Sequence, residues 1–291
     1  MRPPAGAHPA GLTRAAPRAT GGRGPGAGRL ICVLGDAHLD VIVSVTAPVA
    51  PDTDTPAVTS LGTGGQAANV AAWVVALGGR ARLIAARGTD LAGQLVAAGL
   101  SARGVELVGP VIEGRTGVVV ALSDGGHARS MLTDRGVGPG LSAAALRPEW
   151  FAGGGWLHLP AYSLVRQPVQ GAALAAARQL PRLSVDLSST AVLRDYGVSA
   201  FRELLSELRP EVVFGTEPEM ELAGQVPGAV MVVKLGERGV RVDGVLYPAP
   251  PAAAADATGA GDAFAAGYLA GGVSLGLAAA ARAVSKMGAM P

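Results

Sequence analysis

Asp256-Ala257-Thr258-Gly259-Ala260-Gly261-Asp262 runs directly into the apolar stretch 263–270. Small residues followed by an Ala-rich stretch predict a helix over 261–270. The backbone N–H groups at the start of a helix attract anions, and glycines let an anion come close to the backbone. We therefore expect an anion-binding site where this helix begins.

Asp262 is unexpected beside a bound phosphate, because its carboxylate would repel the phosphate. It would be useful as a general base that takes a proton from an attacking hydroxyl, while the N–H groups hold the charge on a transferring phosphoryl group. The simpler interpretation is an acidic residue in the first turn of a helix, which it stabilises by up to about 1 kcal/mol. The segment alone supports both interpretations equally.

A second glycine-bearing segment, Gly62-Thr63-Gly64-Gly65-Gln66-Ala67-Ala68-Asn69, also precedes a predicted helix. This helix is predicted over 66–77, because apolar residues recur at the spacing of one helical face, at Val70, Trp73, Val74 and Leu77. Here too, glycines would let a ligand approach, and the amide of Asn69 could contact ligand hydroxyls. A tight loop before a packed helix is the alternative.

From Leu30 onward, short Val/Ile/Leu runs alternate with Ala/Leu-rich stretches of helical spacing. The predicted strands are 30–35, 82–86, 156–159, 183–186, 211–214 and 229–234. The predicted helices are 66–77, 91–103, 165–179, 199–208, 217–223, 261–270 and 275–287. Strands that alternate with helices predict an α/β fold, a parallel-sheet three-layer α/β sandwich.

Two segments interrupt this alternation. Residues 40–46 and 116–133 are predicted to be antiparallel strands, the second a hairpin that turns at Asp124-Gly125-Gly126. Strands without helices of their own predict a small β-sheet, from about 38–62 and 113–134, that acts as a lid. Its exposed edge would offer a surface for a homodimer.

Composition narrows the class of protein. The chain has 291 residues, of which 49% are hydrophobic and 16% charged, and a single cysteine, Cys32, in an apolar run. We expect a buried thiol and a cytoplasmic location, with no membrane span and no secretory signal. The histidines and the cysteine lack metal-ligand spacing. His158, flanked by leucines, is interpreted as a core histidine.

The charge is unevenly distributed. The formal net charge is +2, but residues 1–29 hold five arginines and no acid, so the remaining chain has 19 basic and 22 acidic residues. A nucleic-acid surface on the folded body is therefore not supported. Residues 1–29 are Pro-, Gly- and Ala-rich, which predicts a disordered basic tail before a domain spanning 30–291. A passive extension is favoured over an interaction arm.

Together, the two glycine-bearing segments resemble the motifs of the PfkB family of carbohydrate kinases, which have the ribokinase-like fold. Gly64, Gly65 and Asn69 match the N-terminal motif, and 256–262 match the C-terminal motif, in the same order along the chain. The resemblance covers about residues 30–291. It implies an enzyme that transfers the terminal phosphoryl group of ATP to a hydroxyl of a sugar or sugar-like molecule, with Mg²⁺ bridging the phosphates.

The resemblance also implies a role for each matching residue. Asp262 is the catalytic base, and the backbone of Gly259, Ala260 and Gly261 forms the anion hole. The substrate is bound by Asp40, Gly64, Gly65 and Asn69. The nucleotide is bordered by 234–239, with Lys234, Gly236 and Gly239 as binding residues, although Lys234 alone would suit a solvated charge. Glu219 matches a position that organises Mg²⁺, and Asp256 a position associated with K⁺ or another monovalent cation.

Two departures from the family pattern affect the details. Thr216 stands where the family often has the Asn of Asn-x-x-Glu, which concerns the handling of Mg²⁺ and phosphate. Arg135-Gly136-Val137-Gly138 lacks the Asn of a Gly-Ala-Asn motif found in ribokinases, which argues against ribose. A nucleoside kinase and a non-catalytic sugar-binding relative remain alternatives. A dehydrogenase fits poorly, because Gly62–Gly65 does not have the spacing G-x-G-x-x-G.

Overall fold

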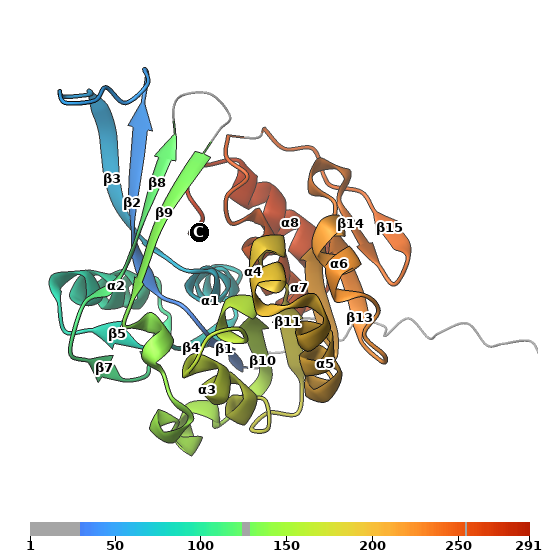
Figure 1. Ribbon diagram of the computed structural model, residues 1–291. Coiled ribbons are helices and arrows are strands. Elements are labelled where there is room, and N and C mark those ends of the chain that lie inside the picture. The colour runs from blue at the N-terminus through green and yellow to red at the C-terminus, as the bar shows by residue number, and fades with distance from the viewer. Residues whose placement is uncertain (1–29, 124–128, 254) are drawn as a thin grey trace, which may run out of the picture.

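The central feature of the computed structural model, which describes residues 30–123, 129–253 and 255–291, is one large sheet (Figure 1). Within these residues its nine strands follow the order β15-β14-β13-β12-β11-β10-β1-β4-β6. Their bounds are β1 (Leu30–Leu34), β4 (Arg80–Ile84), β6 (Glu106–Val108), β10 (Gly154–Pro160), β11 (Leu183–Asp186), β12 (Val212–Thr216), β13 (Val230–Lys234), β14 (Val240–Val242) and β15 (Val245–Tyr247). The strands from β13 to β6 pair in parallel, and β14 and β15 extend the edge antiparallel.

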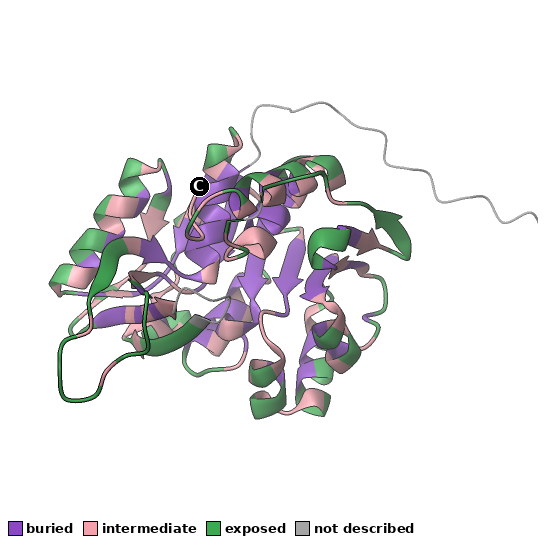
Figure 2. Cartoon of the chain, turned by 90° about the horizontal axis from the view of Figure 1, so that it is seen from above, coloured by how far each residue is buried: buried purple, intermediate pink, exposed green. Residues whose placement is uncertain are grey.

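Helices cover both faces of this sheet. They are α1 (Gln66–Ala76), α2 (Leu91–Ala102), α3 (Val169–Ala176), α4 (Thr190–Tyr196), α5 (Val198–Leu208), α6 (Glu217–Ala223), α7 (Ala260–Gly271) and α8 (Val273–Val284). Strand β1 shows how the core divides, because alternate side chains of a strand face opposite sides. Ile31 and Val33 pack with α1, α7 and α8, whereas Leu30, Cys32 and Leu34 pack with α3 and α5. The predicted three-layer α/β sandwich is confirmed, with its buried residues at the centre (Figure 2).

A separate four-stranded sheet stands beside this body (Figure 1). Its order is β3-β2-β8-β9, formed by β2 (His38–Val45), β3 (Ala57–Gly64), β8 (Thr116–Ser123) and β9 (Arg129–Gly136). The small sheet was predicted, and so was the antiparallel pairing of β8 with β9. The predicted turn at 124–126 lies outside the described residues. The prediction that all these strands are antiparallel is wrong, because β2 and β8 pair in parallel.

Some predicted boundaries differ from the structure. The helix predicted from residue 165 begins at Val169, since Pro168 precedes it and the residue before a proline avoids the helical conformation. The helix α4, the edge strands β14 and β15, and a short parallel pair of β5 (Arg87–Gly88) and β7 (Val111–Ile112) were not predicted. The predicted tail, 1–29, lies outside the described residues. Within the described part of the chain, no helix is long and apolar enough to cross a membrane.

The topology brings distant segments to one edge of the large sheet. The carboxyl ends of parallel strands meet there, and ligands of open α/β sheets bind outside those ends. Asp36 follows β1, Asp186 ends β11, and Lys234 ends β13. The N-terminus of α7 lies beside Lys234, since a Cβ at Gly261 would lie 3.2 Å from the Nζ atom of Lys234. This edge therefore gathers the charged and glycine-bearing segments into one region.

Candidate active site

The segment before α7 forms a helix start that only glycine permits. Gly259 has φ 75°, in the left-handed region, and a Cβ there would lie 2.6 Å from the Cα of Ala289. Helix α7 begins at Ala260, whose N–H donates a long bond of 3.3 Å to the carbonyl of Ala257. The N–H groups of a first helical turn have no partner inside the helix. The residues of the predicted anion hole, Gly259, Ala260 and Gly261, thus lie at a helix start, and anion binding there stays a prediction.

The two glycine-bearing segments meet at the side chain of Asp262. Its Oδ2 atom accepts a hydrogen bond of 2.8 Å from the Nδ2 atom of Asn69, which lies in the first turn of α1. Asn69 is buried, and its Oδ1 atom has no hydrogen-bond partner among the described residues. An unsatisfied buried amide oxygen is costly unless a ligand or water donates to it. Asn69 can therefore orient Asp262 and also accept a hydrogen bond from a substrate hydroxyl.

The carboxyl group of Asp262 holds its proton more tightly than an ordinary aspartate. Burial raises the pKa of Asp262 from 3.8 to about 7, although the hydrogen bond from Asn69 opposes the shift. The nearby carboxylates of Asp186 and Asp36 raise this pKa further, and the ammonium group of Lys234 lowers it. A general base works best when its pKa lies near the working pH. The environment of Asp262 is therefore suited to proton transfer near neutral pH.

Lys234 forms an ion pair that the sequence did not reveal. Its Nζ atom lies 2.8 Å from the Oδ2 atom of Asp186, whose side chain is 1% exposed. Burial alone would raise the pKa of Asp186, but the charge and hydrogen bond of Lys234, with smaller effects of His158 and the N–H of Ser188, together outweigh it, so this pKa lies below its usual range. The simpler interpretation of Lys234 as a solvated charge is wrong, because its side chain is 17% exposed. A fixed positive charge therefore lies next to the start of α7.

A cavity of about 510 Å³ opens beside this positive charge. Its size suits a small organic ligand, for which sites of about 300–1,000 Å³ are typical. Its polar side carries the predicted nucleotide-binding residues Lys234, Gly236 and Gly239 and the helix start at Ala260 and Gly261. Its apolar side is lined by Phe264, Leu277, Ala280, Ala281, Val284 and Pro251. The predicted nucleotide site thus lies along a cavity with one apolar side and one side formed by Lys234 and a helix start, and nucleotide binding there stays a prediction.

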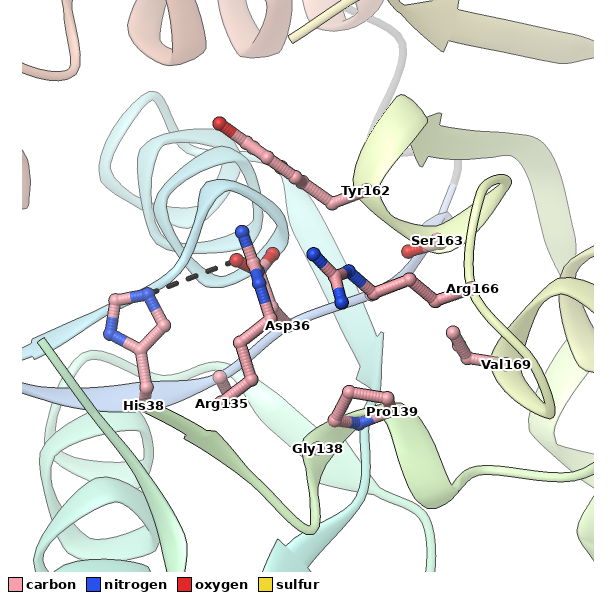
Figure 3. Close-up of a pocket in the computed structure, with 11 residues that line it drawn as sticks. Asp36, His38, Arg135, Gly138, Pro139, Tyr162, Ser163, Arg166 and Val169 are labelled. Atoms are coloured by element: carbon pink, nitrogen blue, oxygen red, sulfur yellow. Dashed lines mark ion pairs between the residues drawn. The ribbon is translucent and has the colours of Figure 1, made fainter. Parts of the chain in front are cut away.

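A second, smaller pocket of about 30 Å³ lies near the start of β2, where Asp36 and His38 line it (Figure 3). Next to this pocket, on β3, Gly64 makes room for the predicted substrate-binding residue Asp40, since a Cβ at Gly64 would lie 2.2 Å from the Oδ2 atom of Asp40. Gly65 has φ 111°, in the left-handed region. Asp36 caps the start of α1 by accepting a hydrogen bond of 3.1 Å from the N–H of Ala67. The predicted residues Asp40, Gly64, Gly65 and Asn69 thus come together at one end of α1.

His38, Arg135, Tyr162 and Arg166 line the same pocket, and sequence reasoning did not select them. His38 lies between two carboxylates, with its Nδ1 atom 3.0 Å from Oδ1 of Asp40. The sequence carried no signal for the others, because they come from β9 and from the loop after β10. By contrast, the prediction that His158 is a core histidine is confirmed. It is fully buried, its Nδ1 atom lies 2.9 Å from Oγ of Ser184, and burial lowers its pKa to about 4.

The two residues predicted to bind metal ions, Glu219 and Asp256, form hydrogen bonds with the backbone near them. Glu219 completes a capping box at the start of α6, where its Oε2 atom accepts a bond of 2.7 Å from the N–H of Thr216. The carboxylate of Asp256 accepts hydrogen bonds from Thr258 and from the N–H of Gly288. Asp256 thereby ties the loop before α7 to the C-terminal segment. Among the described residues, no cluster of three or more His, Cys, Asp or Glu side chains could hold a metal ion alone.

Comparison with solved structures places this arrangement in a known fold. An adenosine kinase from Sinorhizobium meliloti superposes with a TM-score of 0.78 at 24% identity, over 90% of this chain and 95% of that one. A ribokinase from Thermotoga maritima superposes with a TM-score of 0.71 at 20% identity, over 90% and 96% of the two chains. At these identities, the likeness establishes the ribokinase fold.

Comparison of sequences carries the assignment further. An ATP-dependent ribose-1-phosphate kinase from Halopiger xanaduensis is 31% identical over 217 residues, which are 71% of this chain and 72% of that protein. The family profile described as pfkB family carbohydrate kinase matches residues 29–290. The resemblance found in the two glycine-bearing motifs is thereby confirmed over the whole folded body. The chain belongs to the pfkB family of carbohydrate kinases.

Proposed function

We propose that this carbohydrate kinase transfers the terminal phosphoryl group of ATP to a hydroxyl of a sugar-like substrate, with Asp262 as the general base. The observation that carries the proposal is the position of Asp262 in the first turn of α7, with a pKa of about 7 and a hydrogen bond from Asn69. Burial disfavours the charged form of a carboxylate. A carboxylate that only stabilised a helix would not need to be buried. This favours the catalytic interpretation over the structural one.

In the proposed reaction, Asp262 accepts the proton of the substrate hydroxyl as its oxygen attacks the terminal phosphorus of ATP. The bond from that phosphorus to the bridging oxygen breaks, and ADP leaves. The N–H groups at Gly259, Ala260 and Gly261 and the ammonium of Lys234 stabilise the charge on the phosphoryl group. The nucleotide would lie in the cavity beside Lys234, Gly236 and Gly239.

The proposal includes Mg²⁺ bound mainly through the phosphates. Mg²⁺ usually keeps several waters and takes only one or two carboxylates when phosphates are present. Glu219 fits such a role, since it is buried and close enough to Lys234 to raise the pKa of that lysine. Bound there, Mg²⁺ would neutralise part of the phosphate charge.

The proposal also includes a K⁺ ion that binds near Asp256 and raises kcat. Its carboxylate fixes the loop before α7, so a cation bound there would act on the anion hole. We expect K⁺ to raise kcat when it is added to an assay free of Na⁺ and K⁺. Equal rates at matched ionic strength would remove this role.

The acceptor is the open part of the proposed reaction. The relative from Halopiger xanaduensis is named for ribose-1-phosphate, and one structural neighbour is an adenosine kinase, so sugars and nucleosides are both candidates. The assay is ADP release from ATP and Mg²⁺ with sugars, sugar phosphates and nucleosides, followed by ³¹P NMR of the product. We expect an acceptor-dependent rate. If no acceptor raises the rate of ADP release above the rate without acceptor, the proposal is wrong.

Two broader expectations belong to the same proposal. Val58 and Leu61 on β3 and Met131 and Leu132 on β9 are exposed apolar residues at the edges of the small sheet, which supports a homodimer through the lid. A molar mass of one chain by light scattering at assay concentration would contradict it. The cytoplasmic location also stays part of the proposal, because the single cysteine, Cys32, is buried and cannot form an internal disulfide.

A further inference from the structure

The carboxylate of Asp186, at the end of β11, has a different partner on each of its oxygen atoms. Its Oδ2 atom accepts a hydrogen bond of 2.8 Å from the Nζ atom of Lys234, and its Oδ1 atom accepts one of 2.9 Å from the N–H of Ser188. Lys234 ends β13, and β12 lies between the two strands in the sheet. The ion pair therefore reaches across the end of β12, and the position of the ammonium group depends on the backbone that follows β11.

Ser188 is the central residue of a tight turn in that backbone. The N–H of Ser189 donates a hydrogen bond of 2.7 Å to the carbonyl of Leu187, a bond that spans three residues as in a γ-turn. Ser188 has φ 64°, in the left-handed region that residues other than glycine seldom adopt. A strained residue of this kind persists only where its surroundings hold it, and such residues cluster at functional sites.

Two other segments of the fold hold this turn. The hydroxyl of Ser188 donates a hydrogen bond of 2.6 Å to the Oε1 atom of Gln66, the first residue of α1. It also accepts a hydrogen bond of 2.9 Å from the N–H of Ala161, which follows β10. The first turn of α1 carries Asn69, which contacts Asp262. The turn is thus fixed against the same helix that orients the proposed base.

The ammonium group of Lys234 lies where a fixed charge would act on a phosphoryl group. A Cβ at Gly261, in the first turn of α7, would lie 3.2 Å from its Nζ atom, and Lys234 lines the large cavity beside that helix start. Burial alone would lower the pKa of Lys234, but the carboxylates around it, Asp186 above all, raise this pKa above its usual range. Lysine has a flexible chain, and a charge that is already in place needs no reorganisation during the reaction. A group that holds this lysine would therefore contribute to the rate.

We propose that Asp186 and Ser188 are positioning residues for the phosphoryl transfer. The left-handed turn at Ser188 fixes the carboxylate of Asp186, and that carboxylate holds the ammonium of Lys234 beside the transferring group. This inference rests on the proposed function. The reaction itself is unchanged, since the acceptor oxygen bonds to the terminal phosphorus of ATP, its proton passes to Asp262, and ADP leaves with the bridging oxygen. The alternative is a buried ion pair that only stabilises the fold.

Three variants separate the position of the charge from the charge itself. Asp186→Glu keeps the negative charge but moves it by one methylene group, and Ser188→Val disfavours the left-handed turn, because its branched Cβ clashes there. Both should lower kcat about 10-fold or more, the effect of losing a hydrogen bond to a charged group, and leave the KM for the acceptor unchanged. Ser188→Gly keeps the N–H that donates to Asp186 and adopts the turn without strain, so its kcat should stay close to that of the wild type.

Arg209→Val is the matched control. Arg209 also has a left-handed φ, of 49°, but it is exposed, lies at the C-terminal end of α5 and lines neither the large cavity nor the small pocket. Its replacement should lower the melting temperature, as Ser188→Val does, and leave kcat unchanged when each variant is assayed below its melting temperature. If Ser188→Val keeps the kcat of the wild type in the same way, the turn serves only the fold and the positioning role is wrong.

A spectroscopic measurement reports on the ammonium group without turnover. The chain has two lysines, Lys234 and Lys286, so protein labelled with ¹³C at the lysine Cε atom gives one NMR signal for each. Ser188→Val should shift the Lys234 signal and leave the Lys286 signal in place, and Ser188→Gly should shift neither. If kcat falls while the Lys234 signal does not move, the effect does not pass through the ammonium group and the inference is wrong. If the wild type phosphorylates no acceptor but the Lys234 signal still depends on Ser188, the proposed function is wrong while the turn still positions the ammonium group.

Discussion

The side-chain amide of Asn69 donates a hydrogen bond of 2.8 Å to the carboxylate of Asp262, which lies 193 positions further along the chain. The contact joins the first turns of α1 and α7, the two helices that the glycine-bearing segments begin. It ties a residue predicted to bind substrate to the predicted base. The same bond lowers the pKa of Asp262 against the larger effect of burial.

The first prediction follows from that bond. In Asn69→Ala, the pKa of Asp262 loses a group that lowers it and should move above about 7. A base must be deprotonated to act, so kcat/KM should fall more at pH 7 than at pH 9. The measurement is the pH profile of kcat/KM for both proteins. An unchanged apparent pKa would show that Asn69 does not act on the base.

The second prediction concerns the room that Gly64 leaves for Asp40. A methyl group at Gly64 would lie 2.2 Å from the carboxylate of Asp40, so Gly64→Ala must displace that side chain. We expect a rise of about 10-fold or more in the KM for the acceptor, the effect of losing a hydrogen bond to a charged group, and no change in the KM for ATP. Gly62→Ala, on the same strand, is the control, because a Cβ there meets nothing within 4 Å. Equal effects of both variants would contradict a substrate role for Asp40.

The third prediction concerns the buried ion pair. Lys234→Met leaves the carboxylate of Asp186 buried without its partner, which typically destabilises a protein by about 3–5 kcal/mol. Adding Asp186→Asn removes the orphaned charge and should restore much of the stability, as urea denaturation would show. Activity should stay low in the double variant, because Lys234 also lies beside the anion hole. A single variant as stable as wild type would mean that the pair carries little energy.

The sequence predicted most of the fold because its signals are local. A continuous apolar run marks β1, helical spacing marks α1, and an Ala-rich stretch after small residues marks α7. Gly259 and Gly64 mark close approaches of the backbone. It did not predict the pairing of Lys234 with Asp186, or that Arg135 and Arg166 line one pocket, because both depend on which segments become neighbours in the fold. The parallel pairing of β2 with β8 was missed for the same reason. Long-range pairing is set by topology, which spacing along the chain does not encode.

The fourth prediction separates the role of Asp262 in stability from its role in catalysis. Because its pKa is raised from 3.8 to about 7 in the folded protein, the folded state binds more protons than the unfolded state between these values. The stability of the wild type should therefore fall as the pH rises from about 4 to about 7. Asp262→Asn lacks this loss, so its melting temperature should equal or exceed that of the wild type at pH 8. A markedly lower value would indicate that the carboxylate mainly stabilises the helix.

The most direct test of the account is kcat of Asp262→Asn at pH 8 with saturating ATP and acceptor. Asparagine keeps the size of the side chain and can still accept the hydrogen bond from Asn69, but it cannot take a proton. A general base contributes about 10²–10⁴-fold, so kcat should fall by about 100-fold or more while the affinity for ATP is kept or improved. A variant that folds like the wild type and retains more than about a tenth of its kcat would contradict the assignment of Asp262 as the base, given that expected range.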